Sequence, residues 1–245
     1  MGAISKVLGS FLKLIYDALV GIFPNEPESI SFFALSIIIT TIILKLVIVP
    51  LTISQVRNQK KMAELQPEIA KLQKKYKNDP QTLAAKQQQL YKDSNYNMIS
   101  GCLPMIIQMV VLMAFYRVFL KPTTYAFTTE AFAQMNKNFF YISSLEDVDS
   151  TMILSILAAI STFLVSFIAT KNPAQKQMQN EQSQGMMTGM MVFMPIMIFT
   201  MGRKMQSALV LYWIVSNVFA IIQQLITNWI VVKNTNAEEV KKWIM

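Results

Sequence analysis

The residue best placed for chemistry is a lysine inside a long apolar stretch. Lys45 lies within the segment SFFALSIIITTIILKLVIVPLTI, residues 31 to 53. A cation near the centre of a lipid-spanning helix costs about 2.5–3.5 kcal/mol on insertion scales. No Asp or Glu occurs in the four windows that contain the long apolar stretches, residues 29–63, 94–129, 150–180 and 182–237. We therefore expect Lys45 to be reached by water or to attract negative charge from another molecule.

Other residue types that carry chemistry are scarce. The chain has no His and one cysteine, Cys102, which excludes a disulfide framework and an ordinary His/Cys metal site. The only conceivable nucleophile pair is a Ser/Lys-type dyad; its best candidates are Thr41 and Lys45, whose separation of four residues is ordinary helical spacing. Since no phosphate-binding loop occurs either, we expect no enzymatic activity, no nucleotide hydrolysis, no metal and no cofactor.

Neutral polar residues form stripes on the apolar segments. Thr41, Lys45 and Thr52 share one helical face, and a second face carries Trp213, Ser216, Asn217, Gln224 and Asn228. Ser155, Thr162 and Ser166 add hydroxyls on a third segment. For single Ser and Thr residues, interhelical hydrogen bonds of about 0.6 kcal/mol are the simpler explanation. Amides and hydroxyls compensate an ammonium poorly, so we infer a water-accessible cationic groove with Lys45 as its charge. Its candidate lining residues include Thr41, Ser216, Asn217 and Gln224.

Composition places these residues in a membrane protein. The 245-residue chain is 53% hydrophobic and only 15% charged. Its formal charge of +8 lies mostly on loops between apolar segments rather than on a soluble basic face. Membrane orientation explains that placement, and we expect no specific nucleic-acid partner.

The hydropathy pattern predicts an all-α polytopic membrane protein with five transmembrane helices. Residues 1–24 favour an interfacial amphipathic helix over a secretory signal, because Lys13 and Asp17 interrupt the apolar region. The apolar face predicted for this helix contains Ile4, Val7, Leu8, Phe11, Ile15, Ala18, Leu19 and Ile22. The predicted segments after it are spans at 31–55, 98–120, 151–170, 185–201 and 207–232, a helical hairpin at 56–96, loops at 121–149 and 171–184, and a tail at 233–245.

The hairpin is the most polar part of the chain. Its first helix has an apolar stripe that contains Met62, Leu65, Ile69, Leu72 and Tyr76. The sequence Asn-Asp-Pro at 78–80 then supplies a break, a helix cap and a first-turn proline. The stripe favours real helix pairing, and the alternative is a solvated linker that only fixes topology.

Basic residues predict the orientation of the chain. Fourteen Lys and Arg residues lie on the side of the hairpin, the 171–184 loop and the tail, and seven lie on the other side. The positive-inside rule then places the hairpin and the C-terminus in the cytoplasm, and residues 1–24 and 121–149 outside.

Two motifs resemble a known family. The stretches GCLPMIIQ (residues 101–108) and LVLYWIVSN with IIQQ (residues 209–224) are similar to signatures of the YidC/Oxa/Alb family of membrane protein insertases, in its short Gram-positive form. The resemblance covers about residues 30 to 232. It implies a bacterial cell-membrane protein with a hydrophilic groove open to cytoplasm and lipid. It aligns Lys45 with the family's groove cation, often Arg, and places Gln108 and Trp213 at groove positions.

The chain also departs from the family pattern. Met98 and Val110 stand where proline is frequent, and the usual FPSG-like turn reads Met-Gln-Ser-Ala at 205–208. Because no lipoprotein-type cysteine precedes the first predicted span, we expect no lipid anchor.

The function expected from these features is insertion of short membrane proteins into the bilayer. The expected partners are newly made membrane proteins with acidic extracytoplasmic tails and membrane lipid; a ribosome, a targeting factor and the Sec translocon stay open. The alternatives are an anion channel or small-solute transporter that uses Lys45, and a scaffold that only holds other membrane proteins. One lone charge is a poor selectivity ring, which disfavours the channel.

Overall fold

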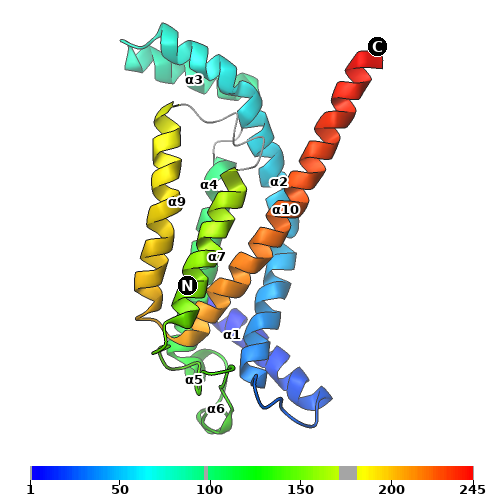
Figure 1. Ribbon diagram of the computed structural model, residues 1–245, viewed down its shortest axis with the longest axis vertical. Coiled ribbons are helices and arrows are strands. Elements are labelled where there is room, and N and C mark those ends of the chain that lie inside the picture. The colour runs from blue at the N-terminus through cyan, green and yellow to red at the C-terminus, as the bar shows by residue number, and fades with distance from the viewer. Residues whose placement is uncertain (1, 97–98, 171–180, 245) are drawn as a thin grey trace.

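The computed structural model describes residues 2–96, 99–170 and 181–244 of the chain, and these form an all-α polytopic membrane protein (Figure 1). Long helices run side by side along the molecule, and the short helices gather at one end. The described ranges contain isolated β-bridges but no strand. The helices are α1 (Gly2–Ile22), α2 (Phe32–Lys75), α3 (Pro80–Asp93), α4 (Ile99–Leu120), α5 (Pro122–Tyr125), α6 (Thr129–Gln134), α7 (Ile153–Thr170), α9 (Glu181–Gly202) and α10 (Ser207–Ile244).

Three described segments are long and apolar enough to cross a membrane. They are Phe32–Gln55 of α2, all of α7, and Ser207–Thr227 of α10. Two shorter apolar segments, Ile106–Leu120 of α4 and Met191–Gly202 of α9, lie in helices of 22 residues each. At about 1.5 Å per residue, each of those complete helices measures about 33 Å, which matches a hydrocarbon core of about 30 Å.

Several helices extend past the ends of the predicted segments. Helix α2 passes without interruption from the first predicted span into the hairpin, and both Pro50 and Pro67 lie inside it. Helix α9 begins at Glu181, four residues before the predicted span, and α10 continues to Ile244 through the predicted tail. Polar residues such as Lys, Glu and Gln favour helix about as much as many apolar ones do, so hydropathy alone does not mark these ends. The rest of the predicted 171–184 loop, residues 171–180, lies outside the described residues.

The hairpin consists of the second half of α2 and the whole of α3, which lie at the end of the molecule opposite α5 and α6 (Figure 1). The Asp79 side chain accepts a hydrogen bond of 3.0 Å from the Thr82 N–H, and Pro80 occupies the first turn of α3. The predicted cap and first-turn proline are therefore present. Ile69 of α2 is buried, whereas no residue of α3 is.

Helix α1 lies obliquely across the end of the bundle that also holds α5 and α6 (Figure 1). It packs against α2, α4 and α5. Its face toward these helices is narrower than the predicted apolar face, because Ile4, Val7 and Ile22 are exposed. The buried residues are Ser5, Leu8, Gly9, Leu12 and Leu19. The exposed apolar residues suit contact with lipid, because lipid tails are as apolar as the interior of a protein.

The loop between α4 and α7 ties together the starts of α2 and α10. The Ser31 N–H donates to the Asn138 carbonyl at 3.0 Å, and the Phe140 N–H donates to the Ser29 carbonyl at 2.6 Å. At the other end of this loop, the Ser207 N–H donates to the Asp147 carbonyl at 2.8 Å. These backbone hydrogen bonds fix the ends of two long helices relative to each other.

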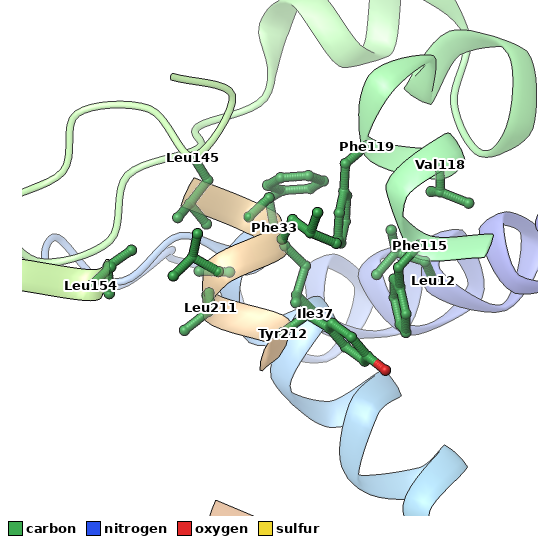
Figure 2. Packing of buried hydrophobic residues seen from close by; sticks show 14 of the residues in the cluster. Leu12, Phe33, Ile37, Phe115, Val118, Phe119, Leu145, Leu154, Leu211 and Tyr212 are labelled. Atoms are coloured by element: carbon green, nitrogen blue, oxygen red, sulfur yellow. The ribbon is translucent and has the colours of Figure 1, made fainter. Parts of the chain in front are cut away.

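An aromatic core lies beneath that loop. The Phe33 ring of α2 packs edge-on against Phe119, Phe127 and Phe132, with ring centroids 5.8–6.5 Å apart. Figure 2 shows Phe115 and Tyr212 within the same cluster, with the Tyr212 hydroxyl pointing out of it. The core therefore holds α2, α4 and α10 together at one end and delivers one phenol oxygen to the polar region beyond.

Candidate functional site

The predicted cation lies among polar groups from three helices. Lys45 of α2 is half-buried, and its Nζ donates a hydrogen bond of 3.0 Å to Oε1 of Gln108 on α4. Within the described residues, Lys45 forms no ion pair with a carboxylate, since the ion pairs there are Lys13–Asp17 and Lys137–Glu146. The ammonium is thus held by a neutral acceptor that leaves its full charge in place.

Gln108 is in turn oriented by two hydroxyls of α10. Its Nε2 donates to the Tyr212 hydroxyl at 3.1 Å and lies 3.5 Å from Oγ of Ser216. Tyr212 and Ser216 are 1% and 2% exposed, so the surrounding core holds both hydroxyls in place. Because the amide nitrogen is turned toward α10, the amide oxygen is turned toward Lys45.

A second polar cluster lies on a neighbouring face of α10, against α7. Trp213 Nε1 donates to Oγ1 of Thr162 at 3.0 Å. The Asn217 side-chain amide lies 3.0 Å from Oγ of Ser161 and 2.9 Å from Oγ1 of Thr162. These contacts match the interhelical hydrogen bonding that is common between transmembrane helices.

The seven predicted site residues therefore separate into groups. Lys45, Gln108 and Ser216 come together at one site, and Trp213 and Asn217 form the cluster with α7. Thr41 is 1% exposed, and its hydroxyl donates to the Ile37 carbonyl of its own helix at 2.7 Å. Gln224 lies two turns beyond Ser216 on α10, within a half-buried part of that helix, and has interactions of its own.

The surroundings of Lys45 are apolar and exposed. On α2, its neighbours Leu46 and Val47 are 56% and 71% exposed, and on α4, Ile106 and Met109 flank Gln108 and are about half exposed. The polar site thus borders an apolar surface of the kind that contacts lipid. A ligand that carries both a negative charge and an apolar segment would find partners for both on neighbouring residues of α2 and α4.

Sequence reasoning missed Tyr212 and Ser161. Tyr212 directly precedes the predicted residue Trp213 and lies one helical turn before Ser216, and Ser161 directly precedes Thr162 of the predicted hydroxyl stripe. The signal for Tyr212 was its spacing of four residues from Ser216, which places the two hydroxyls on one face of a helix.

Comparison with known proteins identifies several relatives. The 60Kd inner membrane protein family model matches residues 27–234. A protein of Clostridium perfringens named membrane protein insertase YidC is 36% identical over 229 residues, which are 91% of this chain and 90% of that protein. A relative of the same name from Fusobacterium nucleatum is 33% identical, over 91% of this chain and 96% of its own length. Membrane protein insertase YidC 2 of Listeria innocua is 38% identical over 80% of this chain, and the match spans 64% of that longer protein.

Proposed function

Because the chain belongs to the 60Kd inner membrane protein family, we propose that it inserts short membrane proteins from the cytoplasm into the lipid bilayer through a cationic hydrophilic groove. The observation that carries this proposal is the Lys45 site. A half-buried ammonium with a neutral amide partner lies beside exposed apolar surface, in a region of the chain without carboxylates.

The proposed groove has Lys45, Gln108, Tyr212 and Ser216 at its polar centre. An acidic tail of the substrate is drawn to Lys45, which lowers the cost of moving carboxylates into the membrane. A carboxylate competes well with Gln108 for the ammonium, because two opposite unit charges attract each other more strongly than an ammonium attracts a neutral amide. The apolar segment of the substrate follows between α7 and α10 into lipid.

The membrane potential assists release of the tail on the far side. Moving one negative charge outward across the full field is favourable by about 2.3 kcal/mol per 100 mV. With the hairpin and C-terminus in the cytoplasm and α1 outside, a negative tail moves in the direction that the potential favours. Insertion then needs no nucleotide hydrolysis by this chain.

Substitution of Lys45 tests the charge. Lys45→Glu should abolish insertion of an acidic-tailed substrate in a strain depleted of its own insertase, and Lys45→Arg should preserve it. Lys45→Gln separates loss of the cation from introduction of an anion and should be intermediate. Wild-type insertion by Lys45→Glu would overturn the proposal, as would anion flux through proteoliposomes without any insertion of polypeptide.

Crosslinking tests the position of the substrate. Photoreactive residues at 45, 108 and 213 should crosslink to a short membrane protein during its translation, whereas one at the α1 position 14, whose leucine is 61% exposed, should not. A cysteine at position 45 should react with aqueous thiol reagents. A cysteine sealed from these reagents would remove the wet groove on which the proposal depends.

The hairpin is proposed to receive the substrate on the cytoplasmic side, near a ribosome, a targeting factor or a Sec translocon. Deletion of residues 60–92 should impair insertion while the remaining protein still enters the membrane. Full activity after this deletion would reduce the hairpin to a topology signal.

A further inference from the structure

A cavity of about 400 Å³ lies at the end of the bundle away from the hairpin, where α4 and α9 end and α10 begins. Its apolar walls include Tyr116 and Leu120 of α4, Met201 of α9 and Leu209 of α10. Tyr116, Leu120 and Met201 are 41–53% exposed, so the cavity opens toward the lipid-facing side of these helices. Because the ends of three apolar helices meet here, we infer that the cavity lies at the depth where hydrocarbon gives way to headgroups.

One wall of this cavity is cationic. Lys204, in the turn between α9 and α10, lines the cavity and is exposed. It forms no ion pair with any carboxylate of the described residues. Three further cations, Arg117, Lys121 and Arg203, lie within one helical turn of lining residues in the sequence. These four cations lie at or close to the cavity in the sequence, on the side of the membrane that the positive-inside rule expects to hold fewer basic residues.

The loop before α7 contacts the start of α10 and carries acidic residues, and one of their carboxylates already has hydrogen-bond partners. Gln206, which also lines the cavity, forms a backbone bridge with Val148. The carboxylate of Asp149, the residue after Val148, accepts hydrogen bonds from Thr151 and from the Leu154 N–H. Asp147 contributes its carbonyl to Ser207. The Asp149 carboxylate is thus already satisfied by hydrogen bonds from its own segment.

We propose that this cavity binds an anionic phospholipid, with an acyl chain along Tyr116, Leu120, Met201 and Leu209 and the phosphate at Lys204 and Gln206. The shape and the charge both support this ligand, since the walls are apolar on the membrane side and the cation lies at the headgroup level. Tyrosine suits such a place because its ring is apolar and its hydroxyl reaches the interface. The site is separate from Lys45 and does not depend on the proposed insertase function.

Native mass spectrometry of the full chain in neutral detergent tests this proposal. Wild type should retain phosphatidylglycerol over phosphatidylcholine with the same acyl chains. Lys204→Gln should bind phosphatidylglycerol about five-fold more weakly, the effect of one lysine near an anionic lipid. Arg203→Gln is the matched control, because Arg203 neighbours Lys204 but stacks over Phe199, with its Cζ 5.7 Å from the ring centroid, and does not line the cavity. It should change binding less than two-fold.

Met201→Trp tests the cavity independently of charge. Met201 is 42% exposed at the rim, so a larger side chain there should fill the cavity without disturbing the core, and should weaken retention of phosphatidylglycerol. Equal retention of both lipids by wild type, or an unchanged affinity in Lys204→Gln, would overturn the proposal. Displacement of the lipid by an acidic peptide would also overturn it and would assign the cavity to polypeptide carboxylates.

Discussion

Replacing Gln108 by glutamate gives Lys45 an internal counter-ion and tests whether its charge must stay available. Lys45 Nζ lies 3.0 Å from Gln108 Oε1, and a carboxylate oxygen fits the same place. The Tyr212 and Ser216 hydroxyls, which lie 3.1 and 3.5 Å from the amide nitrogen, can rotate to donate to the second carboxylate oxygen. The substitution therefore keeps the geometry of the site and changes its charge.

The size of the effect follows from that distance. Two unit charges 3 Å apart attract by about 5–6 kcal/mol at an effective dielectric constant of about 20. The present hydrogen bond between an ammonium and a neutral amide contributes about 1.5–3 kcal/mol. The substrate carboxylate would thus have to overcome about 3 kcal/mol more, which corresponds to about 100-fold lower occupancy of the site.

The assay is protease protection of a short membrane protein inserted into proteoliposomes. We expect Gln108→Glu to reduce insertion of an acidic-tailed substrate strongly, while a version of the substrate with a neutral tail inserts as before. Gln108→Met removes the partner without adding a charge and should retain insertion of the acidic tail. Gln223→Glu, on the same helix α10 as Tyr212, controls for an added carboxylate elsewhere. Equal insertion of the acidic tail by Gln108→Glu and wild type would refute the reasoning.

Three further predictions concern stability and the limits of the site. A Cβ added at Gly9 would clash with the Tyr125 carbonyl oxygen, whereas one added at Gly21 meets nothing within 4 Å. Gly9→Ala should therefore lower the Tm. Gly21→Ala should leave the Tm unchanged or raise it, because alanine has a better helix propensity than glycine. Burial raises the pKa of the Asp149 carboxyl, but hydrogen bonds from Thr151, Leu154 and Tyr141 outweigh this and hold that pKa below its ordinary value. The ionised Asp149 carboxylate therefore stabilises the fold above about pH 4, and this contribution is lost as the pH falls through its lower pKa in the folded state. The difference in Tm between wild type and Asp149→Asn should be largest near pH 6 and should shrink toward about pH 3. The Thr41 hydroxyl is buried against its own helix, so Thr41→Val should change insertion less than two-fold, and a loss as large as that of Lys45→Glu would place Thr41 in the groove.

The sequence predicts the class of the protein well, because that class follows from local composition. A lysine among apolar residues is visible without any structure, and the all-α membrane fold follows from the long apolar segments. The prediction of the family rested on two short motifs, and the comparisons confirm the family. Gln108 stood out because an amide is rare in such a segment.

The partners of these residues could not be predicted in the same way. Whether a side chain on α10 faces α2 and α4 or faces α7 depends on how the helices are rotated about their axes, which hydropathy does not fix. Consecutive residues on a helix point about 100° apart, so Tyr212 and Trp213 serve different neighbours although they are adjacent. Hydropathy also fails to predict the buried face of α1. Gly9 is buried there because the α1 backbone approaches the Tyr125 carbonyl of α5 closely, and this contact has no signal in hydrophobicity.

The polar cluster between α7 and α10 lies on the proposed route by which a substrate leaves the groove. The proposed route passes between α7 and α10, where Trp213 and Asn217 contact Thr162 and Ser161. Interhelical hydrogen bonds in membranes are worth about 0.6 kcal/mol each, so opening these three contacts costs about 2 kcal/mol. A transmembrane segment gains far more than this when about 20 apolar residues move into lipid at up to about 0.6 kcal/mol each. On the proposed route, breaking the contacts between α7 and α10 would therefore cost little compared with the gain from moving an apolar substrate segment into lipid.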